Sequence, residues 1–254
     1  MRTKNARNYE SVVTRLERSL DGQGTLISLG EVSTPGRVHS LKKIVLGKGH
    51  PRKVLISAGI HGDEPAGVET LCAWIEREEY KPYLKNWEFT LIPCINPFGY
   101  EHGVRHNHEN KDLNRHFKSS PPPAEVWIVQ TVFQSPFDLT LELHEDVDSP
   151  GFYLYQTAQP SLNQALGIKI VEEVQKTMPV NPNSRIEGMP ARKGIIDRLS
   201  DPESMPWWPM ALYALSSGAR YCLTLETASR FPLETRVQAH LGAIRAALDH
   251  FSDC

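Results

Sequence analysis

Apolar runs typical of β-strands alternate along this chain with segments in which apolar residues recur at helical spacing. The clearest strand pattern is KVLISAGI at 53–60, a continuous apolar run of the kind found in strands buried on both faces. The segment 65–79 follows with helical spacing, and its leading proline suits a first helical turn. Further strands are predicted at 37–47, 87–95, 137–144, 151–157 and 220–227. Further helices are predicted at 124–134, 161–178, 211–217 and 233–251. This alternation indicates one α/β domain over residues 1–254 with a mixed, mostly parallel central sheet.

Two long segments interrupt the alternation. Residues 96–123 are polar and rich in turn residues, and residues 180–209 contain five prolines. An irregular segment as long as 96–123 is uncommon in a compact domain unless it is functional or disordered. We expect residues 190–215 to line part of a pocket, although their pattern does not indicate which side chain the pocket accepts.

Composition narrows the function classes. The 254 residues are 40% hydrophobic and 23% charged, with a formal net charge of −2. This balance provides no basic face for nucleic acid or for an anionic membrane. No apolar stretch reaches the roughly 18 residues that a membrane span needs. The N-terminal segment carries charge without the apolar core of a secretory signal, so we expect a cytoplasmic protein. The sequence does not indicate an oligomeric state.

The cysteines do not suggest a metal site. Cys72, Cys94 and Cys222 lie in apolar strand-like or helical runs, and none of the four cysteines belongs to a C-x-x-C pattern. We predict that these three are small buried side chains. A zinc site with cysteine ligands is therefore not expected.

Titratable side chains stand where the predicted strands end. His61 and Glu64 follow the first buried strand, and His144 and Glu226 end two later strands. In an open α/β sheet, ligands bind beyond the carboxyl ends of the strands. Two imidazoles and one carboxylate that leave a coordination position open form a hydrolytic zinc site. We therefore predict one zinc ion at His61, Glu64 and His144. Glu226 is left free as the general base that moves a proton from the attacking water to the leaving nitrogen.

The long polar segment adds anion-binding chemistry. Arg105 lies upstream of Asn114 and Arg115, which stand side by side. Arginine binds carboxylates through paired hydrogen bonds and stays charged. One arginine can hold a substrate carboxylate while the other stabilises a tetrahedral oxyanion. Asp112 is better placed as an acceptor behind a ligand histidine, because such imidazoles need an orienting partner.

Six short motifs occur in a fixed order between residues 54 and 227: HGDE, NPFGY, GVRHN, KDLNRHF, LELH and LTLET. As a set they make the chain resemble the zinc carboxypeptidase family, of the carboxypeptidase A type. The resemblance implies a three-layer α/β/α fold. Within the family, the chain looks most like the bacterial murein peptide amidases, which cut the bond between γ-D-glutamate and a diamino acid. The succinylglutamate desuccinylase and aspartoacylase branch is a more distant relative.

The resemblance implies the same zinc ligands and the same base, and it assigns the loop residues. Arg105 corresponds to the arginine that polarises the scissile carbonyl. Asn114 and Arg115 correspond to the pair that clamps a terminal carboxylate of the substrate. Asp112 corresponds to the residue behind the first ligand histidine.

The chain departs from the family pattern at three points. Phe98 replaces the usual aspartate of the NPDG motif, so that loop should turn differently. The mobile tyrosine of carboxypeptidase A falls on Ser204 here, and Tyr213 is the nearest tyrosine. Asp63 stands between the first two ligands, where carboxypeptidase A has an arginine. An acid there disfavours additional substrate carboxylates and favours an amine, as in a diamino acid.

We predict a metallocarboxypeptidase or murein peptide amidase-like enzyme that acts on a peptide or small amide with a free carboxylate. The alternative is an N-acyl amino acid deacylase of the succinylglutamate desuccinylase/aspartoacylase type. A lesser alternative is an inactive binding protein on the same fold. The sequence does not indicate whether Tyr213, Trp207 or Trp208 line the site.

Overall fold

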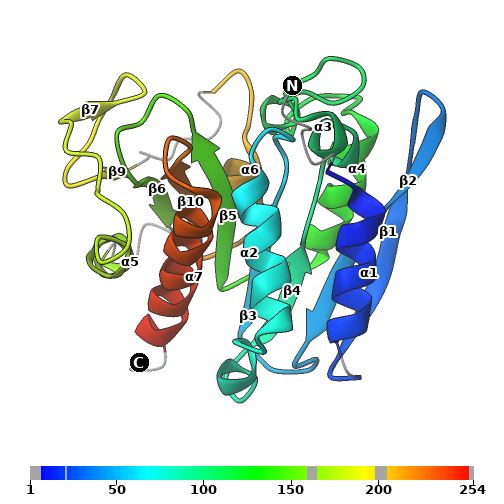
Figure 1. Ribbon diagram of the computed structural model, residues 1–254, viewed down its shortest axis with the longest axis horizontal. Helices are drawn as coiled ribbons and strands as arrows, with labels where there is room; N and C mark the ends of the chain where they lie inside the picture. Colours follow the sequence, from blue (N-terminus) through cyan, green and yellow to red (C-terminus); the bar gives the residue numbers. More distant parts are fainter. Residues whose placement is uncertain (1–6, 21, 159–164, 198–204, 252–254) are drawn as a thin grey trace.

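The computed structural model describes residues 7–20, 22–158, 165–197 and 205–251 (Figure 1). Its main sheet has eight strands, which are, in sheet order, β1 (Gly24–Thr34), β2 (Arg37–Leu46), β4 (Glu88–Ile92), β3 (Lys53–Ala58), β5 (Leu139–Asp146), β10 (Tyr221–Ala228), β6 (Tyr153–Ala158) and β9 (Ile195–Asp197). The central strands β4, β3, β5 and β10 are parallel to one another. The β1–β2, β2–β4 and β10–β6 pairs are antiparallel, whereas β6 and β9 are parallel. A mixed, mostly parallel sheet is therefore confirmed.

Helices cover both faces of this sheet (Figure 1). One face carries a large apolar cluster under four helices, α1 (Tyr9–Ser19), α2 (Pro65–Glu76), α5 (Leu166–Val174) and α7 (Leu233–His250). The opposite face carries a second cluster under α4 (Ala124–Gln130) and α6 (Met210–Ser216). The shorter elements are α3 (Pro97–His102), η1 (Lys81–Tyr83), η2 (Leu113–Arg115), η3 (Thr131–Gln134), β7 (Arg185–Ile186) and β8 (Met189–Pro190). The three layers match the fold that the resemblance implied.

The apolar run of β3 explains why this strand lies at the centre. Val54 and Ile56 belong to the cluster under α2 and α7, whereas Leu55 belongs to the cluster on the other face. All three side chains are fully buried. A strand with apolar residues on both faces is stable only between two layers of helices. The carboxyl end of β3, from which His61 and Glu64 follow, consequently lies between the carboxyl ends of β4 and β5 near the centre of the sheet.

The structure contains elements that the apolar pattern does not reveal. Helix α1 buries Tyr9, Val12, Val13 and Leu16 on one face, within a segment that reads mainly as charged. Strand β1 pairs with β2 as a hairpin. Because β1 is half exposed, it contains polar residues and lacks a clear apolar strand pattern. The long polar segment holds α3 and η2, and the proline-rich segment holds β7, β8 and β9.

Other boundaries shift by a few residues. The predicted helix at 124–134 is α helical only to Gln130 and then tightens into η3. The predicted helix at 161–178 is seen from Leu166, and residues 161–164 lie outside the described part. Ser204 also lies outside it. Cys72, Cys94 and Cys222 are buried thiols, as predicted. No helix in the described ranges is long and apolar enough to cross a membrane.

A buried histidine beneath the sheet makes folding sensitive to acid. His240 on α7 is fully buried, and its Nε2 lies 3.2 Å from Thr227 Oγ1 of β10. Burial lowers the pKa of His240 to about 3, whereas a histidine in an unfolded chain has a pKa of about 6.5. The folded state therefore keeps the imidazole neutral while the unfolded state binds a proton. This stability contribution is complete above pH 6.5 and is lost as the pH falls below that value.

We predict that H240Q loses less stability in acid than the wild type. Between pH 7 and pH 5 the free energy of unfolding should fall by about 2 kcal/mol more in the wild-type protein, because only its unfolded state gains the His240 proton. Urea unfolding at both pH values measures the difference. Equal losses in the two proteins would show that His240 is not the acid-sensitive group.

Candidate metal centre

The turn after β3 is shaped by a close approach of two backbone segments. A Cβ atom on Gly62 would lie 1.9 Å from the carbonyl carbon of Gly99, in α3. Only glycine allows this contact. The amide of Gly62 also donates to the carbonyl of Arg105, and Arg7 Nη1 donates to the carbonyl of Gly62. These contacts fix the turn that carries His61 and Glu64, and Pro65 then begins α2.

Three side chains converge at this turn. His61 Nδ1 lies 2.7 Å from Glu64 Oε1, and His144 Nδ1 lies 2.9 Å from Glu64 Oε2. One ligand atom from each residue lies within 4.8 Å of the others. The two imidazole rings meet edge to face, with centroids 4.9 Å apart. All three side chains are buried, and the structure thus brings together the three residues that the sequence suggests as metal ligands.

Asp112 orients the first imidazole. Its Oδ1 lies 3.0 Å from His61 Nε2, so Nδ1 of that ring is turned toward Glu64. Arg105 holds Asp112 in turn, because its Nε and Nη2 both donate to Asp112 Oδ2 at 3.1 Å. A carboxylate behind a histidine is the usual outer partner of a metal ligand. The predicted place of Asp112 behind His61 agrees with this geometry.

Glu142 stands behind the second imidazole. It points to the same side of β5 as His144, and its Oε2 lies 3.8 Å from His144 Nε2. The side chain is 1% exposed, and neither carboxylate oxygen has a hydrogen-bond partner among the described residues. A buried carboxylate at Nε2 favours the tautomer with its proton on Nε2, which leaves the Nδ1 lone pair free. Both imidazoles thus offer Nδ1 to one point, as a metal site requires.

The electrostatics of the centre favour a cation. Burial opposes the charge on Glu64, but His61 and His144 lower the pKa of Glu64 well below its usual range. Burial likewise opposes charge on the two imidazoles, yet Glu64 raises the pKa of both. The carboxylate therefore stays ionised and needs positive charge beside it. Two imidazole nitrogens and one carboxylate oxygen are the donor set of hydrolytic zinc sites, so the residues fit a zinc ion.

Glu226 faces the centre from the neighbouring strand. Its Cα pairs with that of His144 in the parallel register of β10 and β5. Burial raises the pKa of Glu226 to about 7, and the negative charge of Glu64 acts in the same direction. A carboxylate with a pKa near neutrality can both accept and return a proton at that pH. This property suits the predicted general base.

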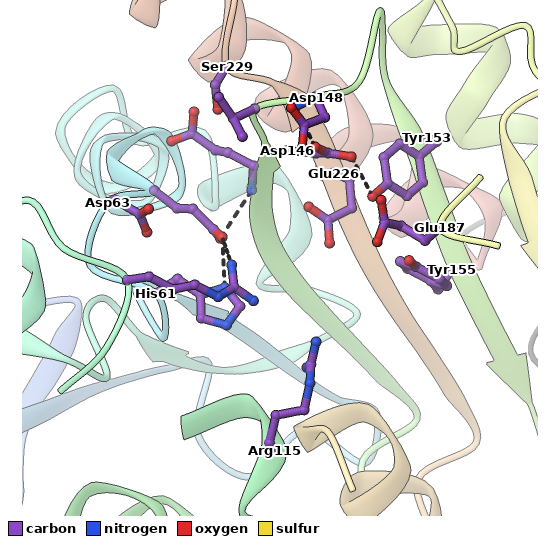
Figure 2. Close-up of a pocket in the computed structure, with 14 residues that line it drawn as sticks. His61, Asp63, Arg115, Asp146, Asp148, Tyr153, Tyr155, Glu187, Glu226 and Ser229 are labelled. Atoms are coloured by element: carbon purple, nitrogen blue, oxygen red, sulfur yellow. Dashed lines mark hydrogen bonds and ion pairs between the residues drawn. The ribbon is translucent and has the colours of Figure 1, made fainter. Parts of the chain in front are cut away.

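The centre opens into a cavity of about 510 Å³ (Figure 2). Figure 2 shows Glu226 on one wall, Asp63 beyond His61 and Arg115 at the other end. Asp63 is exposed and lines this cavity, and its charge adds to those that raise the pKa of Arg105. Its predicted influence on specificity stays a prediction.

A smaller pocket of about 250 Å³ adjoins the cavity and is lined by Asn114 and Arg115. Asn114 Oδ1 accepts a hydrogen bond from the amide of Met210, so its Nδ2 is left to donate. The Arg115 guanidinium lies 4.2 Å from the ring centroid of Trp207. Stacking on an aromatic face holds the guanidinium in place without removing its hydrogen-bond donors. The pair is thus positioned to bind an anion.

The structure shows which of the three aromatic residues Trp207, Trp208 and Tyr213 line the site. Trp207 lines the smaller pocket. Trp208 is 9% exposed and belongs to the apolar cluster on the α4 and α6 face. Tyr213 packs on that cluster, with ring centroids 5.7 Å from Phe117 and 5.4 Å from Phe133. Trp208 is therefore a core residue, and Tyr213 is a partly buried residue that packs against the core.

Sequence reasoning missed the wall formed by Tyr153, Tyr155, Asp148 and Glu187, which line the cavity. Strand alternation signals the tyrosines only weakly, since both lie in β6 without a motif. Glu187 comes from the proline-rich segment, whose pattern indicates no element. Glu145, three residues after Glu142, is buried and paired with Arg236.

Comparisons with known proteins agree with this geometry. Residues 50–236 match the succinylglutamate desuccinylase/aspartoacylase catalytic domain. The chain is 40% identical over 73 residues to murein peptide amidase A of Escherichia coli (strain K12), which covers 29% of this chain and 26% of that protein. This match therefore spans about a quarter of the length of that curated relative. These are the two branches that the sequence motifs resemble, and the family model matches the branch that the motifs indicate as the more distant.

Solved structures share the fold. A Shewanella amazonensis SB2B protein provisionally named a metallopeptidase has a TM-score of 0.83 at 22% identity and covers 95% of this chain and 92% of its own. A metallo-carboxypeptidase from Burkholderia cenocepacia has a TM-score of 0.69 at 20% identity, with 96% and 69% covered. A Pseudomonas aeruginosa metallo-carboxypeptidase in complex with (2-guanidinoethylmercapto)succinic acid has a TM-score of 0.66 at 19% identity, with 96% and 68% covered. The chain belongs to the succinylglutamate desuccinylase/aspartoacylase family and has the fold of the metallo-carboxypeptidases.

Proposed function

We propose that this protein is a zinc-dependent hydrolase that cleaves an amide bond beside a residue with a free carboxylate, as metallocarboxypeptidases and murein peptide amidases do. One observation carries the proposal. His61 and Glu64 line the larger cavity together with Glu226 and Arg115, and His144 lines the adjoining smaller pocket together with the same two residues. The metal-ligand group, a base and an anion site would therefore face one substrate. The single domain and the cytoplasmic location stay predictions.

The ligand group defines the chemistry at the reacting carbonyl. A zinc ion held by His61, Glu64 and His144 would polarise the carbonyl and lower the pKa of a water molecule in its open position. The protein itself sets the donor atoms. Asp112 and Glu142 orient the two imidazoles, and the amide of Glu145 donates to Glu64 Oε2 at 3.1 Å. These outer contacts keep the carboxylate and both Nδ1 atoms aimed at one point.

Glu226 moves the proton. With a pKa near 7 it accepts a proton from the attacking water as that water adds to the carbonyl. It then donates the same proton to the leaving nitrogen, which departs as an amine. Its place opposite His144 on the adjacent strand brings the carboxylate to the reacting side of the cavity.

The arginines divide two tasks. Arg105 lies beside Glu64, with Nη1 3.3 Å from Glu64 Oε1, and its partly exposed guanidinium lines the cavity. It is placed to stabilise negative charge on the carbonyl oxygen during attack. Arg115 and Asn114 line the adjoining pocket and are placed to bind the substrate carboxylate by paired hydrogen bonds.

The second candidate is an N-acyl amino acid deacylase. The family match over residues 50–236 favours it, because that family is named for a desuccinylase and an acylase. Both reactions need the same metal ligands and base, so substrate choice separates them. A hydrolysis panel of C-terminal peptides, γ-D-glutamyl-diaminopimelate peptides and N-acyl amino acids tests the two candidates directly. An inactive binding protein is disfavoured because ligands, base and arginines are all present.

We predict that the metal depends on Glu64 and, less strongly, on Asp112. The purified protein should contain about one zinc per chain, and E64A should contain none because it loses the central carboxylate. D112N should bind zinc roughly 10- to 100-fold more weakly, since it loses the charged partner of His61. Metal analysis and calorimetric zinc titration measure both effects. H102A, which removes an exposed histidine outside the centre, is the control and should keep full occupancy.

A measurement of zinc content should also distinguish the role of Glu226 from that of the metal ligands. E226Q should keep the wild-type zinc content and melting temperature, while kcat falls by roughly 10²- to 10⁴-fold because the proton carrier is lost. Steady-state rates on the best substrate of the panel, measured beside metal analysis, test this. Unchanged zinc-dependent hydrolysis in E226Q would remove Glu226 from the mechanism.

Arg115 should act on binding of the carboxylate. R115Q should raise KM roughly 10- to 100-fold for a substrate with a free carboxylate, because a charge-assisted hydrogen-bond pair is lost. The same substrate with a carboxamide should be a poor substrate for the wild type and should not distinguish the two proteins. If R115Q raises KM equally for the carboxylate and the carboxamide substrates, Arg115 does not bind the carboxylate.

A further inference from the structure

A short hairpin borders the catalytic cavity on the side away from Asp63 (Figure 2). Strands β7 and β8 pair Ile186 with Met189, so Glu187 and Gly188 form a two-residue connection. Both connecting residues have positive φ, 49° for Glu187 and 75° for Gly188. This combination defines a type I′ turn, which favours asparagine followed by glycine. Glu187 therefore stands at the tip of a tight hairpin.

Glu187 is the link between the two hollows of the site. It lines the larger cavity together with the metal ligands His61 and Glu64, and it lines the smaller pocket together with Asn114 and Arg115. Figure 2 shows its carboxylate directed into the cavity on the side of Glu226 and Tyr155, with Arg115 at the far end. A substrate residue bound by its carboxylate at Arg115 would thus extend its side chain toward this wall.

The acids on the wall around Glu187 form no ion pair with any cation among the described residues. Asp146 on this wall is already engaged, since it accepts from the Tyr153 hydroxyl at 2.9 Å and from the amide of Asp148 at 2.7 Å. The exposed carboxylate of Glu187 has no ion pair or hydrogen bond with any residue in the described ranges. Arg105, the cation nearest the metal ligands, is paired with Asp112 and Glu64. The unmatched charge faces the pocket for the substrate.

We propose that Glu187 selects an amino acid residue with a cationic side chain, an ammonium or a guanidinium, at the position bound by Asn114 and Arg115. This residue is the one that leaves with the amine when the amide is cut, so the inference rests on the proposed function. The carboxylate of the leaving residue binds at Arg115, and its side-chain cation binds at Glu187. The positive charge of Arg115 and the negative charge of Glu187 thus bind the two oppositely charged groups of the leaving residue.

A hydrogen bond between charged partners in a partly open pocket is worth about a tenfold preference. Lysine and norleucine provide the matched pair, because their side chains have similar length and differ in the terminal ammonium. With the acyl group that the substrate panel selects, the wild type should cleave the lysine substrate with a kcat/KM about tenfold above that of the norleucine substrate. E187Q should bring this ratio close to one by lowering only the lysine value, and E187K should invert it.

Two variants separate specificity from folding. E187N places a residue favoured in this turn, so its melting temperature should equal or exceed that of the wild type while the lysine preference is lost. Glu78 also has positive φ, 56°, but it pairs with Lys81 and lines neither hollow of the site. E78Q is the matched control and should keep the wild-type ratio. A lysine preference that survives in E187Q, E187N and E187K would overturn the inference.

Binding of the released amino acids gives a readout that does not depend on turnover. Calorimetry with the zinc-loaded protein should show free lysine binding about tenfold more weakly to E187Q than to the wild type, and norleucine binding equally to both. Glu187-dependent lysine binding without hydrolysis of any panel substrate would support this inference and overturn the proposed function. Hydrolysis with lysine binding that is equal in wild type and E187Q would overturn the inference alone.

Discussion

The placement of one buried carboxylate between two imidazoles governs the structure of the site. Glu64 has each oxygen within hydrogen-bond distance of a different histidine, and it is almost excluded from water. A buried ionised carboxylate is costly unless positive charge or donors surround it. The neighbouring contacts meet this need: Arg105 and the amide of Glu145 donate to Glu64. A divalent cation answers the same electrostatic demand more completely, which is why the cluster is best understood as a metal site.

The sheet makes this arrangement possible. Because β3, β5 and β10 are parallel neighbours, the residues at their carboxyl ends meet at one edge although they are far apart in sequence. The register that sets Glu226 opposite His144 places this proposed base beside the candidate metal-ligand group. Gly62 adds the last constraint, since its missing side chain lets the backbone of α3 close over the turn and bring Arg105 and Asp112 into reach.

Positive and negative side chains lie on different walls of the cavity. Arg115, stacked on Trp207, and the donor Asn114 stand in the smaller pocket, whereas Asp148 and Glu187 stand on the opposite wall with their charges exposed. Partly open sites of this kind gain specificity from charge placement more than raw affinity. On the proposed function, the metal centre would determine which bond can break, and the charged walls would determine which residue is held beside it. The two functions lie on different elements and can vary separately.

The sequence by itself determined the residues that sit at strand ends, His61, Glu64, His144 and Glu226, because a buried strand is a local apolar pattern and its exit is the next few residues. The partners in the long polar segment could be assigned because their motifs match a known family. Tertiary structure alone decided which of the adjacent Trp207 and Trp208 faces the site, since neighbouring residues with one composition differ only in what packs against them. It alone revealed Glu187, because a two-residue turn in a proline-rich segment has no periodic pattern and gains its meaning from the cavity that the rest of the chain builds.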